Sequence, residues 1–306
     1  MMNGILAVWK PAGWTSHDVV AKARRLLRTK RIGHAGTLDP QVTGVLPLCI
    51  GKATRVVEYM QDLPKAYEAV LQLGLSTDTQ DLTGTVMEEL GTVRVSEQEL
   101  RRTLVSFVGE IEQLPPMYSA VKVDGKRLYE LAREGKTAQR KPRKATIYEL
   151  ELLEADLERD HPVIRFSVRC SKGTYIRTLC VDIGQALGVP AVMAKLVRTQ
   201  SGGLTERDCL TLEEVEALQE DGTLQARLLP PDAVLAHLPQ AVAGEEAARM
   251  ALQGRRIAYC LLREREDGER LTRLYGEDGT FLGVFQPESE VSELKPVKVF
   301  KPEETE

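Results

Sequence analysis

The sequence predicts a mixed α/β (α+β) fold with a small β domain at its C-terminal end. Through residue 235, strand-like apolar runs are interspersed with stretches of helical periodicity. Three prolines, Pro230, Pro231 and Pro239, then mark a change in composition. Beyond them, short alternating runs are separated by Asp-Gly turns, a pattern typical of a small barrel or sandwich. We therefore expect one domain over residues 1–235 and a second over 240–301.

The first elements are a strand and a helix. "GILAVWKP" is a strand that ends at Pro11, and "TSHDVVAKARRLL" is a helix that Thr15 or Ser16 can cap. The loop "GHAGTLDP" follows. The next segments are a buried strand, a helix, a strand and an acidic turn: "GVLPLCIG", "KATRVVEYMQDL", "AYEAVLQLGLST" and "DTQDLTG".

The middle of the chain alternates between the two patterns. "SEQELRRTLVSFVGEI" is a helix with a capping box, because Glu99 follows Ser96 by three residues. "LPPMYSAVKVDGKRLYELAREG" begins extended, turns at Asp124-Gly125 and becomes a helix from Lys126. The later segments are a basic linker into a strand, a strand and helix joined by a Gly173 turn, and a last helix: "TAQRKPRKATIYEL", "VIRFSVRCSKGTYIRTLCVDIGQAL" and "TLEEVEALQ".

Positive charge is concentrated in two segments, although the net charge is −4. Residues 1–60 carry nine Lys/Arg against three Asp/Glu, and residues 119–146 carry nine against three. Two basic blocks on an acidic chain are typical of a nucleic-acid footprint confined to one face. Charge alone leaves solvated helix surface as an equal alternative.

Several classes of protein find no support. The five cysteines are scattered without a CxxC pair, and the four histidines are dispersed, so no zinc-site spacing occurs. The start lacks the pattern of a signal peptide and no apolar run is long enough to cross a membrane, which favours a cytoplasmic protein. Motifs of ATPases, zinc proteases and serine hydrolases are missing as well.

Asp39 is the first candidate for chemistry. It precedes Pro40, which biases its backbone toward an extended conformation, and Gly33 and Gly36 let a ligand approach closely. In "CSKGTYIRTL", Tyr175 and Arg177 stand at a strand end beyond a glycine turn, where an arginine can keep a carboxylate ionised. Taken singly, each residue also fits a structural role in a turn or core.

The order of these motifs resembles the bacterial tRNA pseudouridine-55 synthases (the TruB family). The resemblance runs through "GHAGTLDPQVTGVLPLCIGKATR", "KAYEA", "LGLSTDTQDLTG", "PPMYSAVKVDGKRLYELAREG", "CSKGTYIRTL" and "LVRTQSGG", and covers about residues 3–235. It implies a pseudouridine-synthase fold with a central, largely antiparallel sheet flanked by helices, and a PUA-type C-terminal domain. Val197 departs from the family, which has an arginine there.

The resemblance also implies roles for single residues. Asp39 matches the essential aspartate, Arg177 the arginine that pairs with it, and Tyr67 the ring that packs on the target uracil and is one candidate base at C5. Three further residues match substrate-binding positions: Tyr175, Leu196 in the uracil pocket, and His34, which enters the RNA loop when nucleotides flip out.

An RNA partner follows from the same resemblance. It implies base flipping at the T-loop uridine of the tRNA T-arm, with no cofactor, no metal and no obligatory protein partner, in a monomer. Residues 119–146 correspond to an insertion that closes over RNA. We expect six residues to contact RNA, namely Arg24, Arg25, Lys126, Arg127, Lys141 and Arg143.

Three alternatives stay open. A pure RNA-binding or chaperone protein would not need the set of Asp39, Tyr67, Tyr175 and Arg177. A guide-RNA-dependent enzyme of a larger assembly would act on ribosomal RNA. A glycosidase would need a second acid close to Asp39, and the sequence offers none.

Overall fold

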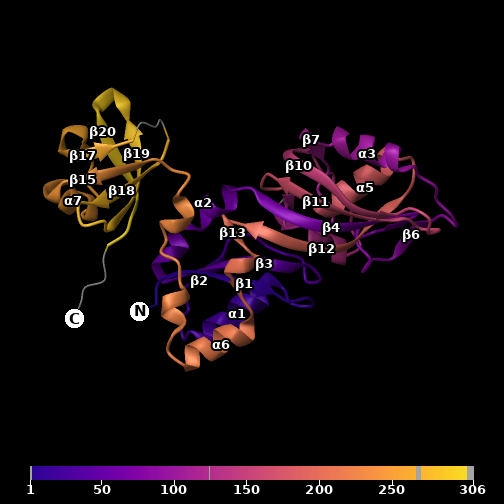
Figure 1. The fold of residues 1–306 in the computed structure, drawn as a ribbon, viewed down its shortest axis with the longest axis horizontal. Coiled ribbons are helices and arrows are strands. Elements are labelled where there is room, and N and C mark those ends of the chain that lie inside the picture. Colours follow the sequence, from indigo (N-terminus) through magenta and orange to yellow (C-terminus); the bar gives the residue numbers. More distant parts are fainter. Residues whose placement is uncertain (1, 124, 267–269, 302–306) are drawn as a thin grey trace.

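The computed structural model describes residues 2–123, 125–266 and 270–301 (Figure 1). The helices of the larger part are α1 (Ser16–Leu26), α2 (Val57–Asp62), α3 (Glu97–Ser106), α4 (Leu128–Arg133), α5 (Ile176–Ala186) and α6 (Leu212–Glu220). Its main strands are β1 (Gly4–Lys10), β2 (Ile32–His34), β3 (Thr43–Ile50), β4 (Lys65–Leu73), β7 (Gly109–Gln113), β10 (Arg143–Asp156), β11 (Val163–Cys170), β12 (Ala191–Ser201), β13 (Leu204–Thr205) and β14 (Cys209–Leu210). Two small hairpins pair β5 (Leu75–Thr77) with β6 (Val86–Glu89) and β8 (Lys122–Val123) with β9 (Lys126–Arg127).

The main strands form one sheet across the larger part of the described chain. Their order is β14-β1-β3-β12-β4-β11-β10-β7, with β2 joined to β3 and β13 to β12. All neighbours are antiparallel except β1 with β14 and β3 with β12. The prediction of a mixed fold on a largely antiparallel sheet is therefore confirmed.

Helices cover this sheet because successive strand residues point to opposite faces. Leu6 and Val8 of β1 pack with Val19 of α1 and Val215 of α6, and Figure 1 shows these two helices next to β1. Toward the other end of the sheet, α3 and α5 pack over β4, β10 and β11. Thr15 caps α1: its side chain accepts from the N–H of Asp18, and the Asp18 carboxylate accepts from the Thr15 N–H. The sequence had left Thr15 and Ser16 open for this role.

Several boundaries differ from the sequence prediction. The expected helix "KATRVVEYMQDL" is a 3-10 helix over Gly51–Val56 followed by α2, and the expected strand "AYEAVLQLGLST" divides into β4 and β5. The helix after Ser96 ends at Ser106, and "GEI" begins the edge strand β7, because these residues pair with β10. The basic helix begins at Leu128, not Lys126, since Lys126 and Arg127 pair with β8. The expected turn at Asp124-Gly125 falls partly on Asp124, which lies outside the described residues.

The C-terminal strands form a second, barrel-like sheet. They are β15 (Gln240–Ala243), β16 (Ile257–Ala258), β17 (Leu262–Arg265), β18 (Thr272–Gly276), β19 (Phe281–Glu288) and β20 (Glu293–Val299), in the order β16-β20-β19-β18-β15-β17. A helix that the sequence did not suggest, α7 (Glu245–Leu252), buries Ala247 and Ala251 against them. The expected strand "IAYCLL" is broken by a helical turn over Tyr259–Leu261. The division into domains of 1–235 and 240–301 stays a prediction.

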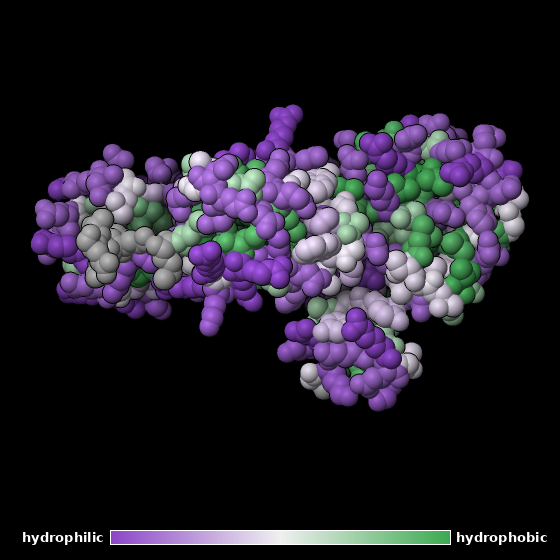
Figure 2. Space-filling model, turned by 90° about the horizontal axis from the view of Figure 1, so that it is seen from below, coloured by the Kyte–Doolittle hydropathy of each residue, from purple (hydrophilic) through white to green (hydrophobic). Residues whose placement is uncertain are grey.

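The end of β20 and the residues after it contact the segment that follows β3. Lys298 Nζ pairs with Glu58 Oε1 at 2.8 Å, and Lys52 Nζ donates to the Lys301 carbonyl at 2.9 Å. Phe300 packs into the core that contains Met60. The face in Figure 2 is mostly hydrophilic, with hydrophobic residues in separate patches. Among the described residues, no helix is long and apolar enough to span a membrane.

Candidate active site

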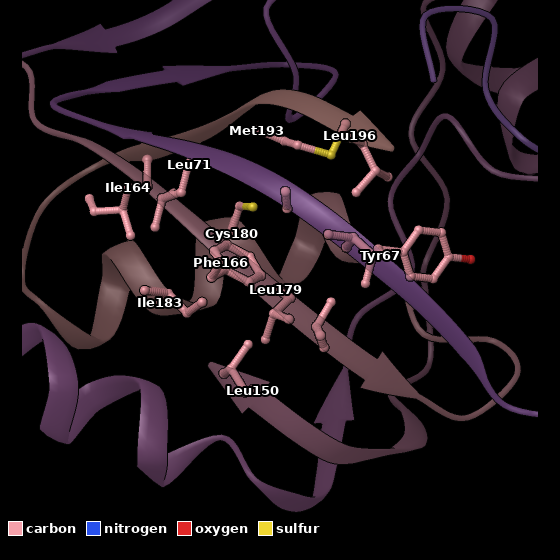
Figure 3. Packing of buried hydrophobic residues seen from close by; sticks show 14 of the residues in the cluster. Tyr67, Leu71, Leu150, Ile164, Phe166, Leu179, Cys180, Ile183, Met193 and Leu196 are labelled. Carbon is pink, nitrogen blue, oxygen red and sulfur yellow. The ribbon is translucent and has the colours of Figure 1, made fainter. Parts of the chain in front are cut away.

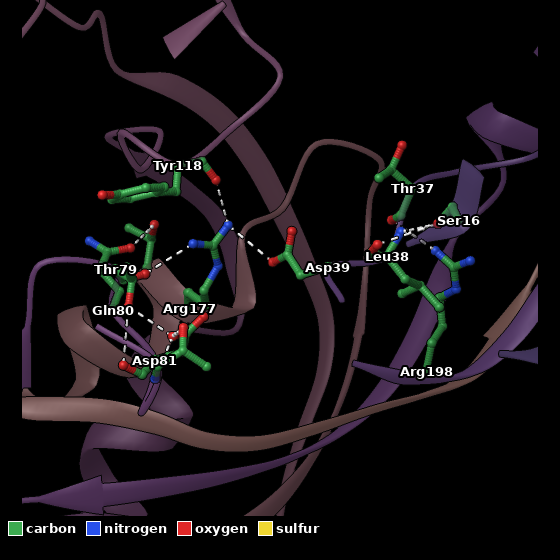
Figure 4. Close-up of polar contacts among 12 residues, drawn as sticks. Ser16, Thr37, Leu38, Asp39, Thr79, Gln80, Asp81, Tyr118, Arg177 and Arg198 are labelled. Atoms are coloured by element: carbon green, nitrogen blue, oxygen red, sulfur yellow. Dashed lines mark hydrogen bonds and ion pairs between the residues drawn. The ribbon is translucent and has the colours of Figure 1, made fainter. Parts of the chain in front are cut away.

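The loop that carries Asp39 connects β2 to β3, and buried Ser16 holds it on one side. The Leu38 N–H donates to Ser16 Oγ at 2.9 Å, and Ser16 Oγ donates to the Leu38 carbonyl at 3.3 Å (Figure 4). Since Leu38 directly precedes Asp39, these bonds fix the backbone where the carboxylate leaves it.

Lys10 braces the other end of the loop. It ends β1 and is fully buried, and its Nζ donates to the carbonyls of Pro11, Trp14 and Pro40 at 2.9, 2.5 and 2.9 Å. Burial lowers the pKa of Lys10 to about 8, while the nearby charge of Asp39 opposes that change. Lys10 therefore brings a positive charge near the Asp39 carboxylate and anchors Pro40, the residue that follows Asp39.

Arg198 of β12 also holds the loop in place, through hydrogen bonds to its main chain. This β12 residue is 1% exposed. Its Nε donates to the Val45 carbonyl at 2.8 Å, Nη2 to Gly36 at 3.1 Å and Nη1 to Thr37 at 3.4 Å. Because a guanidinium presents donors in a rigid fork, one side chain fixes the loop relative to β3.

Arg177 lies in the first turn of α5, not at the strand end that the sequence suggested. The turn is held from across the sheet by Gln113 of β7. The Tyr175 N–H donates to Gln113 Oε1 at 2.9 Å, and Gln113 Nε2 donates to the Tyr175 carbonyl at 3.1 Å. This amide clamp sets the direction in which the arginine enters the site.

The guanidinium of Arg177 joins three separate segments of the chain. Nη1 donates to the Thr79 carbonyl at 2.9 Å, and Nη2 donates to the Tyr118 carbonyl at 2.7 Å. Nη2 also lies 3.0 Å from Asp39 Oδ2 (Figure 4). The arginine side chain is 8% exposed and the aspartate side chain 43%, so a buried cation presents a carboxylate that solvent or a ligand can reach.

Two opposing effects act on the carboxyl of Asp39. Burial raises its pKa above the ordinary value, and the charges of Arg177 and Lys10 lower it, while that of Asp81 raises it. Arg177 is the largest favourable influence on the ionised form.

The carboxylate borders a cavity of about 590 Å³, a size suited to a nucleotide. The residues around it come from the Asp39 loop, β4, the root of the basic insertion, the start of α5 and β12. They include Leu38, Asp39, Tyr67, Tyr118, Ser119, Arg143, Tyr175, Arg177, Leu196 and Arg198. Five of the six catalytic or substrate-binding candidates from the sequence therefore meet at one cavity.

Tyr67 and Leu196 lie at the edge of the hydrophobic core on neighbouring strands β4 and β12. In Figure 3 the Tyr67 hydroxyl points away from the other labelled core residues. Each residue is 8% exposed. Burial raises the pKa of Tyr67, and the charge of Arg198 opposes this. The ring thus offers a flat apolar surface with a protonated hydroxyl.

His34 is the sixth candidate and does not line this cavity. It ends β2 beside α1, with its ring edge-on to that of His17 at a centroid distance of 5.6 Å. Its Nδ1 is buried and has no hydrogen-bond partner in the described part of the chain. Burial lowers the pKa of His34, so the imidazole is neutral at neutral pH.

The six basic residues assigned to RNA contact are all exposed. Arg24 also donates to the Ile32 carbonyl at 2.9 Å, Lys126 pairs with Glu134 at 3.7 Å, and Arg127 Nη1 donates to the Tyr129 hydroxyl at 3.0 Å. Arg143 borders the Asp39 cavity itself.

Sequence reasoning missed three supports of the site, namely Lys10, Ser16 and Arg198. Each is fully buried or nearly so and donates to main-chain carbonyls of the loop. A signal was present for two of them, since a lysine in the apolar strand "GILAVWK" and an arginine in "LVRTQSGG" need partners once buried.

Two solved structures of multi-component complexes share this fold. The chain superposes on "Crystal Structure of a Cbf5-Nop10-Gar1 Complex" with a TM-score of 0.77, 29% identity, and coverage of 98% of this chain and 86% of that one. A second match, "Structure of H/ACA RNP bound to a substrate RNA containing 2'-deoxyuridine", has a TM-score of 0.75 at 27% identity, covering 98% and 85%.

Curated relatives are similar over nearly their whole length. A "tRNA pseudouridine synthase B" of Bacillus licheniformis is 46% identical over 302 residues, 98% of each chain, and one of Geobacillus thermodenitrificans is 45% identical over 306 residues, 98% of this chain and all of that one. With the fold and the cavity, they define the class of this protein: it is a pseudouridine synthase, an isomerase.

The family models give the particular membership. "TruB family pseudouridylate synthase (N terminal domain)" matches residues 24–176, and "tRNA pseudouridylate synthase B C-terminal domain" matches residues 177–236. The chain belongs to the TruB family.

Proposed function

We propose that this chain is a tRNA pseudouridine-55 synthase that isomerises the T-loop uridine with the Asp39 carboxylate. The observation that carries the proposal is the 3.0 Å contact of Asp39 with buried Arg177 at the mouth of the cavity. A carboxylate placed beside a nucleotide-sized cavity and held by an internal cation is suited to act on a sugar or base. The names of the curated relatives point to tRNA as the RNA.

The reaction conserves all atoms. The bond between N1 of uracil and C1′ of ribose breaks, the base rotates, and C5 bonds to C1′. C5 loses one proton and N1 gains one. Asp39 either traps or stabilises the detached sugar, as in the acylal and glycal routes, or adds to the base, as in the base-adduct route. All three routes require the ionised form of Asp39, which the charge of Arg177 favours.

The other cavity residues hold the flipped base. The Tyr67 ring packs on uracil, with Leu196 and Tyr175 closing the pocket. Tyr67 is also our candidate for the base at C5, and its protonated hydroxyl must first give up its own proton. His34 fills the space that flipped nucleotides leave in the RNA loop, where a neutral ring can stack.

Positive surface outside the cavity binds the RNA backbone. Exposed Arg24 and Arg25 on α1 and the basic residues of the 119–146 insertion, among them Lys141, contact phosphates. Arg143 can contact either a phosphate or the flipped nucleotide, because it borders the cavity. In this proposal the protein works as a cytoplasmic monomer with no protein partner and no cofactor.

The solved structures favour a second candidate, a guide-RNA-dependent enzyme of a larger assembly, since one title names an H/ACA RNP bound to a substrate RNA and another a complex of Cbf5, Nop10 and Gar1. The curated relatives are 43–50% identical to this chain, against 27–29% for those structures, and are named as tRNA enzymes. Turnover of naked, unmodified tRNA by the purified protein supports the first candidate, and a requirement for added guide RNA and proteins supports the second.

The decisive experiment compares wild type with Asp39→Asn on an unmodified T-arm stem-loop, with pseudouridine and RNA affinity both measured. We expect the variant to bind RNA and to form no product. Asp160→Asn is the control, because it removes an exposed carboxylate outside the cavity. If wild type binds the RNA without converting it, the protein is a pure RNA-binding protein. If Asp39→Asn retains full turnover, Asp39 does not take part in the reaction.

A further inference from the structure

A buried hydroxyl without a partner stands in the wall of the Asp39 cavity. Ser119 is 7% exposed and lines the cavity beside Tyr118. Its Oγ is buried and has no hydrogen-bond partner among the described residues. Neither the reaction nor the loop supports described above use it.

Hydrogen bonds hold the backbone on both sides of Ser119, so the position from which its side chain projects is fixed. The preceding carbonyl, of Tyr118, accepts from Arg177 Nη2 at 2.7 Å. The Ser119 carbonyl accepts from the Tyr129 N–H at 3.1 Å, and the Val121 carbonyl accepts from the Leu128 N–H at 2.8 Å. These bonds attach one end of the basic insertion to the arginine that pairs with Asp39.

An unpaired buried hydroxyl is costly, and native proteins satisfy nearly all such groups. Here the residue that carries the unpaired group lines the cavity that receives the nucleotide in the proposed function. Uracil offers the N3–H donor and the O4 acceptor on one edge, and its ribose offers the 2′-hydroxyl. A serine hydroxyl can donate and accept, so it can pair with any of these groups.

We infer that Ser119 is a substrate-binding residue whose Oγ hydrogen-bonds the flipped target nucleotide, at the N3/O4 edge of uracil or at the 2′-hydroxyl. The inference rests on the proposed function. The backbone next to Ser119 is bonded to Arg177, so the inferred bond couples the seating of the nucleotide to the arginine that pairs with Asp39.

The test measures RNA affinity in an Asp39→Asn background, where no turnover intervenes. Parent and Ser119→Ala proteins are compared on three T-arm stem-loops whose target nucleotide is uridine, 2′-deoxyuridine, or the pyrimidin-2-one riboside, which lacks both O4 and the N3–H. We expect Ser119→Ala to weaken binding of the uridine RNA about tenfold, as loss of one buried hydrogen bond does. The effect should vanish on the analogue that lacks the partner group.

Two controls separate this effect from a folding defect. Ser119→Thr keeps a hydroxyl and should bind within about twofold of the parent. Ser106→Ala removes a hydroxyl on α3 that bonds the Thr103 carbonyl, outside the cavity, and should change nothing.

Each outcome decides the inference. A tenfold effect that disappears with one analogue supports it and tells whether the partner is the N3/O4 edge of uracil or the 2′-hydroxyl. An equal effect on all three RNAs, or no effect on any, overturns it. Turnover by the otherwise wild-type protein is measured in parallel, so that failure to form pseudouridine rejects the proposed function independently of the Ser119 result.

Discussion

Replacing Ser16 by alanine tests whether the loop supports set the position of Asp39. Ser16 is fully buried, and its Oγ accepts from the Leu38 N–H at 2.9 Å and donates to the Leu38 carbonyl at 3.3 Å. Ser16→Ala removes one oxygen and leaves a buried N–H and a buried carbonyl without that partner. A buried donor left unsatisfied costs about 1–3 kcal/mol, and the longer second bond adds less, so we expect unfolding free energy to fall by about 2 kcal/mol.

The same substitution should lower turnover. Without these bonds the backbone at Leu38 is free to shift, and displacement of a reacting group by about 1 Å can cost about a hundredfold in rate. We therefore expect single-turnover rates on an unmodified T-arm to drop by between about tenfold and a hundredfold, with RNA affinity retained because the basic surface is unchanged.

The neighbouring residue supplies the control. Thr15→Ala removes the cap of α1 and should cost about 1 kcal/mol without slowing the chemical step. Urea unfolding gives the stability of both variants, and rapid-quench measurement of pseudouridine gives their rates. If Ser16→Ala slows turnover no more than Thr15→Ala, or changes stability by less than about 0.5 kcal/mol, the loop is not held as described.

Three further substitutions probe the site. Burial raises the pKa of Asp39 and the charge of Arg177 lowers it, so Arg177→Gln should raise that pKa further. The ionised carboxylate is the active form and is lost as pH falls, so the acid limb of the pH–rate profile should move to higher pH. An acid limb that does not move contradicts this role of Arg177. Tyr67→Phe should keep RNA binding and slow tritium release from [5-³H]uridine RNA by at least about a hundredfold; unchanged release assigns C5 deprotonation elsewhere. Replacing Lys141 and Arg143 together by alanine should make the negative slope of log binding constant against log salt concentration less steep by about 1.5. An unchanged slope would mean that neither residue contacts a phosphate.

Local sequence determined most of the elements and the identity of the central residues. An apolar run located β1, alternation located β4, and a polar residue before a helical pattern located α1 and α3. These signals act within a few residues, so they are readable without the fold. The order of motifs around Asp39 sufficed to suggest the family, which the comparisons then confirmed.

Boundaries failed where pairing partners lie far away. "GEI" continues a helical pattern locally, yet becomes the strand β7 because β10 offers it a ladder of hydrogen bonds. Lys126 and Arg127 leave the helix for the same reason, through their pairing with β8. In each case a tertiary hydrogen-bond partner outweighs a weak local preference.

Only the tertiary structure decided how the site is held together. Arg177 meets carbonyls 98 and 59 positions away in the chain, at Thr79 and Tyr118, and Arg198 reaches Gly36 across 162 positions. Nothing in the residues beside these donors specifies such acceptors, because main-chain carbonyls are present at every position. The sequence supplied the charged groups; the order of strands in the sheet decided which buried carbonyls they meet, and so where Asp39 stands.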